Sequence, residues 1–178
     1  MNSPKTIAII GLGYVGLPLA LEFAKQYHTI GFDINSKRVR EIKTAADSTL
    51  EVTSQELSRV LCPNLIALNQ KTFGFLPTID RMDISDANIY IVTVPTPIDK
   101  NNHPILTPLL SASETVGAVL KKGDIVIYES TVYPGVTEDE CVPVLVKSSN
   151  LIYNKDFLKV TLLSVLIQEI KSVPLPKS

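Results

Sequence analysis

The chain has 178 residues, of which 45% are hydrophobic and 20% are charged, and its formal net charge is −1. This length suits one domain with a real core, and the balanced charge gives no electrostatic signature for binding nucleic acid or an anionic membrane. Residues 6–21 are interrupted by glycines and a proline, and the apolar run at 160–167 is far shorter than the ~20 residues that span a bilayer. The two cysteines, Cys62 and Cys141, are too far apart for a metal knuckle or a redox pair, which indicates a reduced cytoplasmic protein. We therefore expect a cytoplasmic protein with no membrane segment and no nucleic-acid partner.

The first forty residues predict a βαβ unit. Residues 6–10 form a β-branched apolar run that is typical of a buried strand, and the G-x-G-x-x-G run at 11–16 follows it. Apolar residues at helical spacing then predict a helix from about 15 to 27. Residues 29–33 predict a second strand, which ends in Asp33. Parallel strands with a crossover helix are the result.

Each glycine of this loop has its own physical role if the loop binds a dinucleotide. Gly11 would form the tight turn, Gly13 would let a pyrophosphate approach the backbone, and Gly16 would let the helix pack closely on the strand. Free N–H groups at the start of the helix would hold the phosphates. Asp33 would accept both ribose hydroxyl protons and repel a 2′-phosphate, which favours NAD over NADP. The alternative is a plain glycine turn with a helix-capping aspartate, but the strand before the loop and the helix after it favour dinucleotide binding.

The rest of the chain continues to alternate. We predict helices over 37–43 (capped by Ser36), 55–61 (capped by Thr53 or Ser54), 107–120 and 137–145, and strands over 89–94 and 125–128. This order predicts a Rossmann-like, doubly wound α/β fold with a parallel sheet and no linker before residue ~150.

Two loops that follow predicted strands carry unusual chemistry. The segment 94–97 is a stiff turn with two prolines and one hydroxyl, and the segment 129–135 is dense in hydroxyls and backbone-restricting residues. Either could be a plain turn when taken alone. Because ligands bind at the carboxyl ends of parallel strands, both together indicate a site.

These motifs together resemble a known family. GLGYVGLP at 11–18, VTVPTP at 92–97 and ESTVYPGVTE at 129–138 are similar to the nucleotide-sugar 6-dehydrogenases, the UDP-glucose/GDP-mannose dehydrogenase family. Asp47 with the following Thr-Leu-Glu, PTPID at 95–99 and YESTVYPG at 128–135 are most similar to the branch that acts on UDP-N-acetyl-hexosamines, such as UDP-N-acetylglucosamine or UDP-N-acetylgalactosamine. That branch supplies uronic acids for Vi-type capsule and O-antigen polysaccharides.

The resemblance implies an NAD-dependent oxidoreductase that converts a sugar C6 alcohol to a carboxylate in two hydride transfers, acting as a homodimer. By the same resemblance, the cofactor-binding residues are Gly11, Gly13, Tyr14, Val15, Gly16, Asp33, Arg38, Val92, Thr96 and Thr131. Among them, Arg38 would lie beside the adenine end, and residues 92–96 would line the cofactor crevice. Thr131 would be an auxiliary catalytic residue near the nicotinamide, helping to place a water. One departure is Ile105, where the family pattern has an acid, and this weakens a loop contact.

The tail departs from the family at about Lys159. Family members continue with Gly-Tyr-Ser-Pro-Glu-Arg-Ile-Asn-Pro-Gly-Asp-Lys, whose glutamate is catalytic, and no residue of the tail from 160 to 171 resembles it. However, codons can be written for the tail that spell this whole motif when they are read from the last base of the Lys159 codon. We hypothesise that 159–178 is an out-of-frame segment, from a frameshift or a sequencing error, after an NAD-binding domain at 1–158. We then expect the sheet to be truncated before its last strands, with an exposed edge prone to aggregation.

The family's catalytic cysteine, with its assisting lysine and aspartate, has no counterpart in these residues. Cys62 and Cys141 are expected to be buried structural thiols, and His28 and His103 to be surface residues, so no metal site is expected. The basic cluster at 37–43 is expected to be a solvated helix face, apart from Arg38.

Three hypotheses follow for the function. The chain is the NAD-binding half of a nucleotide-sugar 6-dehydrogenase with a UDP-sugar substrate, or it is an inactive fragment that at most binds NAD. A homodimer is not expected for such a fragment. The third hypothesis is another Rossmann enzyme, such as a hydroxy-acid dehydrogenase or a sugar epimerase, and the paired loops argue against it.

Overall fold

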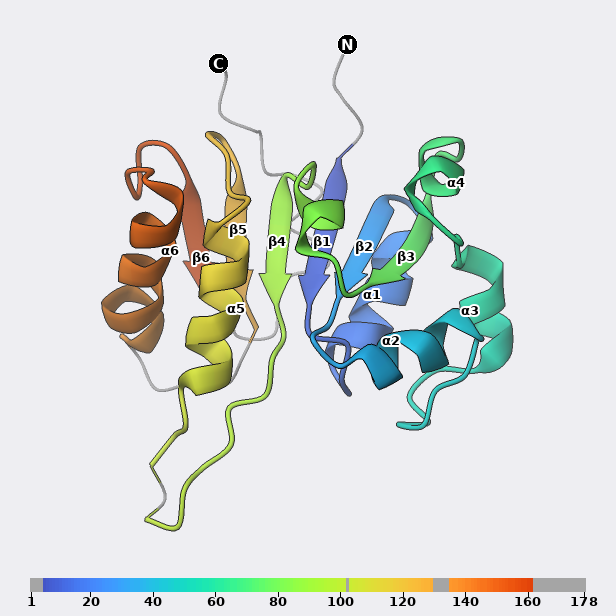
Figure 1. The fold of residues 1–178 in the computed structure, drawn as a ribbon, viewed down its shortest axis with the longest axis horizontal. Helices are drawn as coiled ribbons and strands as arrows, with labels where there is room; N and C mark the ends of the chain where they lie inside the picture. The colour runs from blue at the N-terminus through green and yellow to red at the C-terminus, as the bar shows by residue number, and fades with distance from the viewer. Residues whose placement is uncertain (1–4, 102, 130–134, 162–178) are drawn as a thin grey trace.

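Six parallel strands form one sheet in the order β3-β2-β1-β4-β5-β6 (Figure 1). The computed structural model describes residues 5–101, 103–129 and 135–161. The strands are β1 (Thr6–Ile10), β2 (His28–Phe32), β3 (Gly74–Thr78), β4 (Ile89–Val92), β5 (Ile125–Tyr128) and β6 (Leu158–Thr161). The strand order reverses direction between β1 and β4, which is the switch point where open α/β sheets bind their ligands. The Rossmann-like fold class is confirmed.

Helices connect the strands and cover both faces of the sheet. They are α1 (Gly16–Ala24), α2 (Ser36–Lys43), α3 (Ser54–Val60), α4 (Leu65–Asn69), α5 (Thr107–Gly117) and α6 (Val142–Ser149), with a 3₁₀ turn η1 (Arg81–Ile84) and a π-helical turn η2 (Thr137–Cys141). Helix α3 begins with a capping box, in which Thr53 and Glu56 satisfy each other's backbone N–H groups. A side-chain cap of this kind fixes the residue at which the helix starts.

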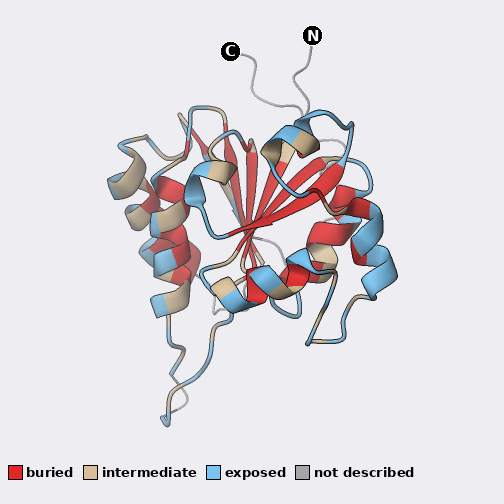
Figure 2. Cartoon of the chain, turned by 45° about the vertical axis from the view of Figure 1, so that its right-hand side comes forward, coloured by how far each residue is buried: buried red, intermediate tan, exposed pale blue. Residues whose placement is uncertain are grey.

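Alternate residues of the central strands supply two separate cores. Ile7, Ile9, Ile89 and Ile91 pack with α1 and α3, for example against Leu17 and Leu57. Their neighbours Ala8, Ile10, Tyr90 and Val92 pack with α5 and α6, for example against Val116 and Leu145. Figure 2 shows this burial running through the strands and the inward sides of the helices. The near-continuous apolar runs of the sequence follow from this, because both faces of the sheet are covered.

The sheet continues past the point where we expected it to stop. Strand β6 pairs in parallel with β5, and Ile125 lies opposite Leu158 while Tyr128 lies opposite Thr161. The expectation that the next parallel strand is missing is therefore wrong. Apolar and polar residues alternate in the segment 158–161, and two of its residues are β-branched. This composition suits a strand in whichever reading frame the segment arose. The ammonium of Lys159 also forms an ion pair with Glu138 of η2.

Two local expectations are corrected, and one strand is added. The N-cap of α2 is Asn35 rather than Ser36, since the Asn35 side chain accepts hydrogen bonds from the N–H groups of residues 37 and 38. Strand β3 was not predicted at all. His28 is not a surface residue: it is only 8% exposed, and its Nε2 lies 2.7 Å from the Lys71 carbonyl oxygen.

Candidate dinucleotide-binding site

The glycine loop follows the carboxyl end of β1, which lies between β2 and β4 in the sheet. Gly11 has φ +97°, a conformation that favours glycine, and its N–H donates to the Phe32 carbonyl at 2.8 Å. A Cβ on Gly16 would lie 1.8 Å from the Gly11 carbonyl oxygen, so a side chain cannot fit there. A Cβ on Gly13 would meet nothing within 4 Å. The loop is thus tightly packed at both ends and open in the middle.

The start of α1 is suited to an anion. Its N-cap residue, Val15, makes no side-chain capping hydrogen bond, and the first turn holds no acidic residue. Backbone N–H groups at such a helix end favour negative charge. Tyr14 and Val15 are 69% and 56% exposed, so their side chains are available to a ligand.

Asp33 follows β2 directly and holds the loop from the other side. Its Oδ2 accepts the Leu12 N–H at 2.8 Å, and its Oδ1 accepts the Asn35 N–H at 2.8 Å. Its own N–H donates to the Thr78 carbonyl of β3 at 3.1 Å. A carboxylate oxygen has two lone pairs, so each oxygen retains acceptor capacity for a ribose hydroxyl.

Thr93 joins the end of β4 to the same loop. Its hydroxyl lies 2.8 Å from the Gly11 carbonyl oxygen and 3.1 Å from that of Ile10. The sequence placed Thr93 only within the crevice segment 92–96, without this role. A threonine directly after a central strand was the available signal, since such hydroxyls bond to nearby carbonyls.

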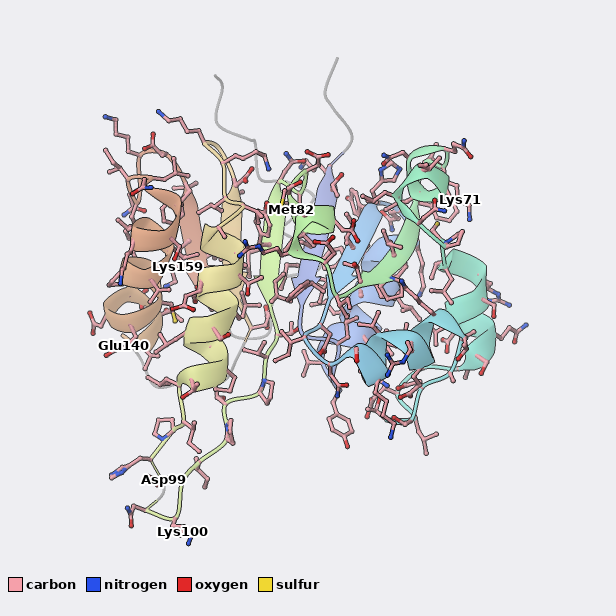
Figure 3. The ribbon with its side chains drawn as sticks, in the orientation of Figure 1. Lys71, Met82, Asp99, Lys100, Glu140 and Lys159 are labelled. Carbon is pink, nitrogen blue, oxygen red and sulfur yellow. The ribbon has the colours of Figure 1, made fainter. Side chains whose placement is uncertain are left out.

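The other two predicted residues of the β4 segment differ from each other. The Val92 side chain is fully buried in the α5–α6 core, and its carbonyl accepts the Glu129 N–H at 2.9 Å. Any contact of Val92 with a ligand would therefore have to involve its backbone. Thr96 is half-buried at the base of an arm, residues 95–106, that extends beyond the helices (Figure 3).

This arm is a narrow hairpin. The Asp99 N–H donates to the His103 carbonyl at 2.8 Å, and the Ile105 N–H donates to the Pro97 carbonyl at 2.7 Å. Asp99 and Lys100 lie at its tip in Figure 3. The Ile105 side chain is 39% exposed. His103 is exposed, as expected, with its ring 3.6 Å from the Asp99 carboxylate.

Arg38 is buried, unlike the other basic residues of its cluster. Its Nε donates to the Leu12 carbonyl at 2.8 Å, and its terminal nitrogens contact Glu41, Asp47 and Thr49. The guanidinium thus lies behind the glycine loop with its donors bound to protein groups. The sequence missed Asp47 as a partner because nothing in the local pattern brings this loop to α2.

The remaining candidate residues lie apart from the glycine loop or outside the described part of the chain. Thr131 lies outside the described residues. Cys62 and Cys141 are both buried, as predicted, and burial raises the pKa of the Cys141 thiol. Burial likewise raises the pKa of Glu129, the first residue of the hydroxyl-rich segment 129–135. Within residues 5–101, 103–129 and 135–161, no group of three or more His, Cys, Asp or Glu side chains could hold a metal ion. No helix in that part of the chain has the length and hydropathy needed to cross a membrane.

A glycine loop that opens a helix at the switch point, with an acid at the end of the neighbouring strand, defines a dinucleotide-binding Rossmann domain. A sequence profile described as the UDP-glucose/GDP-mannose dehydrogenase family, NAD binding domain, matches residues 5–163. The chain belongs to this family, and its cofactor is NAD.

Individual relatives support the family assignment. The chain is 54% identical over 151 residues to UDP-N-acetyl-D-glucosamine 6-dehydrogenase of Pseudomonas aeruginosa, covering 85% of this chain and 33% of that protein. It is 50% identical to Protein CapL of Staphylococcus aureus, over 86% of this chain and 33% of that protein. The structure of UDP-D-ManNAc dehydrogenase from Pyrococcus horikoshii matches with a TM-score of 0.75 at 30% identity, over 90% of this chain and 37% of that one. The chain therefore spans about a third of the length of these curated relatives.

Proposed function

We propose that this chain is the NAD-binding part of a UDP-N-acetyl-hexosamine 6-dehydrogenase, which oxidises the sugar C6 alcohol to a carboxylate for surface polysaccharides such as capsule or O-antigen. One observation carries the proposal: the open glycine loop and Asp33 share one edge of the sheet in a chain 54% identical to a UDP-N-acetyl-D-glucosamine 6-dehydrogenase. Free buried thiols at Cys62 and Cys141 suit the reducing cytoplasm, where we place the protein.

The residues present fit NAD. The space at Gly13 suits a pyrophosphate, the uncapped start of α1 suits its charge, and Asp33 has acceptor capacity for the adenosine ribose. Tyr14 and Val15 would pack on the dinucleotide, and Thr96 would line the crevice beside the backbone of Val92. Bound NAD supplies the hydride acceptor of the reaction. Thr131 is proposed to help place a water near the reacting carbon.

The 178-residue polypeptide by itself is proposed to bind NAD without oxidising a sugar. A thiol nucleophile is needed to carry the second oxidation through a covalent intermediate. Cys62 and Cys141 are buried within the domain, and neither reaches the glycine-loop edge as an exposed thiolate. We likewise propose that the homodimer of the intact family does not form with this polypeptide alone.

We also propose that the natural reading frame changes near Lys159, after an NAD-binding domain at 1–158, and that 159–178 is out of frame, although the family profile extends to residue 163. The amino acids of the tail support this, because codons can be chosen for them that spell twelve family residues in order when read from the last base of the Lys159 codon. Sequencing the gene across codons 155–165 tests it. A one-base slip that restores the motif is the expected result, and a gene in which no slip restores it contradicts the proposal.

An assay of NADH formation tests the proposed activity. The purified chain, and a version with the frame restored and the downstream gene included, are each mixed with NAD and UDP-N-acetylglucosamine or UDP-N-acetylgalactosamine. NADH should form only with the restored protein. NADH production by the 178-residue chain contradicts its inactivity, and no turnover of either sugar by the restored protein contradicts the substrate class.

A further inference from the structure

The loop between α2 and α3 is organised around one buried carboxylate. The Asp47 side chain is only 1% exposed. Its Oδ1 accepts the Thr49 N–H at 3.0 Å and the Thr49 hydroxyl at 2.6 Å, and its Oδ2 accepts the N–H groups of Glu51 and Val52 at 2.9 and 3.0 Å. Ala45 and Leu50 on either side adopt left-handed φ values of +56° and +60°. A strained backbone of this kind persists only where such bonds hold it.

The same carboxylate holds Arg38. The Asp47 Oδ1 lies 2.8 Å from Nη1 of Arg38, which also contacts Glu41 at 3.0 Å, while Nη2 contacts the Thr49 hydroxyl at 3.3 Å. With its terminal nitrogens bound in this way, the guanidinium directs Nε at the Leu12 carbonyl, at 2.8 Å. The planar fork of arginine gives this arrangement a fixed direction.

Both polar backbone groups of Leu12 are therefore hydrogen-bonded to side chains. Its N–H is bound by Asp33 at 2.8 Å, and its carbonyl is bound by Arg38. The Leu12–Gly13 peptide is trans and planar, so its carbonyl and the Gly13 N–H point in opposite directions. Because Arg38 draws the carbonyl toward α2, the Gly13 N–H is directed away from α2, at the residue where the loop is open.

We propose that Asp47 is a positioning residue for cofactor binding: through Arg38 it orients the Leu12–Gly13 peptide, so that the Gly13 N–H is preset to donate to the pyrophosphate. This inference rests on the proposed assignment of the glycine loop to the pyrophosphate. Presetting a donor before the ligand arrives lowers the cost of ordering the loop on binding. Arg38 and Asp47 thereby act from behind the loop, on the protein side of the site.

Two variants and one control test the proposal. Asp47→Asn removes the charge and places an amide donor against the N–H groups of Glu51 and Val52, and Arg38→Lys removes the Nε donor. Thr53→Ala is the control, since the Thr53 side chain bonds to Glu56 in the capping box of α3. Affinities for NAD and for adenosine are measured by NMR titration, and the Gly13 amide resonance is followed without ligand.

We expect both variants to weaken the affinity for NAD about tenfold and to shift the Gly13 resonance. Asp47→Asn should leave the affinity for adenosine within about twofold, and Thr53→Ala should change none of these quantities. An equal loss of affinity for NAD and for adenosine in Asp47→Asn would indicate general disorder and overturn the proposal. An unmoved Gly13 resonance in both variants would overturn it whether or not NAD binds. If the wild type bound no NAD while the variants still moved Gly13, the proposed function and the phosphate role would fail together, and only the structural clamp would remain.

Discussion

A side chain on Gly16 would place its Cβ 1.8 Å from the carbonyl oxygen of Gly11, whereas a side chain on Gly13 would meet nothing within 4 Å. The two glycines therefore serve different ends, although they belong to one motif. Gly16 is required because the start of α1 packs directly against the Gly11 backbone and the Thr93 hydroxyl. Gly13 leaves room that the folded chain itself does not use.

The pair gives a matched test of this difference. We expect Gly16→Ala to lower the free energy of unfolding by about 3 kcal/mol, because backbone and the Thr93 hydroxyl must move. Gly13→Ala should change it by less than about 1 kcal/mol, yet weaken NAD about tenfold. Urea unfolding and calorimetric titration of both variants provide the measurements. A stable Gly16→Ala, or a Gly13→Ala variant with unchanged NAD affinity, would contradict the assignment.

Asp47 predicts a pH dependence of stability. Burial alone would raise its pKa, but hydrogen bonds from Thr49, Arg38 and Val52 outweigh burial and lower the pKa from 3.8 to about 2. Such a group stabilises the fold above its unfolded pKa, and the stabilisation is lost as the pH falls toward its folded pKa.

We therefore expect Asp47→Asn to be less stable than the wild type by about 3 kcal/mol at neutral pH, since it breaks a buried ion pair. The difference should shrink as the pH falls from about 4 to 2. Urea unfolding of both proteins at a series of pH values measures it. A difference that stays constant down to pH 2 would show that the Asp47 carboxylate is not specifically stabilised in the folded state.

The burial of the two cysteines predicts slow thiol chemistry. Cys62 and Cys141 are 2% and 0% exposed, and burial raises the pKa of Cys141, which disfavours the reactive thiolate. We expect a thiol reagent such as DTNB to modify neither cysteine quickly in the folded chain and to titrate both in denaturant. A fast-reacting thiol in the folded chain would reopen the question of a nucleophile among these residues.

Much of the fold could be predicted from local pattern. The runs at 6–10, 89–92 and 125–128 are β-branched and apolar because both faces of the sheet are covered, and their order along the chain indicates parallel pairing. Strand β3 was missed because Gly74 and Pro77 give its sequence, GFLPT, the appearance of a loop. Its place at the edge of the sheet is what permits the proline.

The candidate site likewise has residues that the local sequence predicts and contacts that it does not predict. The glycines and Asp33 could be found because their spacing is fixed by one local unit, and the structure brings them to one edge of the sheet, while their role in binding stays a prediction. The bonds from Arg38 to Leu12 and Asp47 depend on contacts between separate segments. His28 was misjudged for the same reason, because the Lys71 carbonyl that satisfies its ring comes from a distant part of the chain. The sequence around a single polar residue does not show which distant group will be its hydrogen-bond partner.

Calorimetric titration of the chain with NAD and NADP, repeated with Asp33→Asn, tests the central claim most directly. The substitution keeps the shape of the side chain and removes the charge that favours a free ribose and repels a 2′-phosphate. We expect the wild type to bind NAD at least about tenfold more tightly than NADP, and Asp33→Asn to lose about tenfold in NAD affinity and most of that preference. Equal affinity for the two cofactors in the wild type, or unchanged NAD binding by Asp33→Asn, would contradict the account.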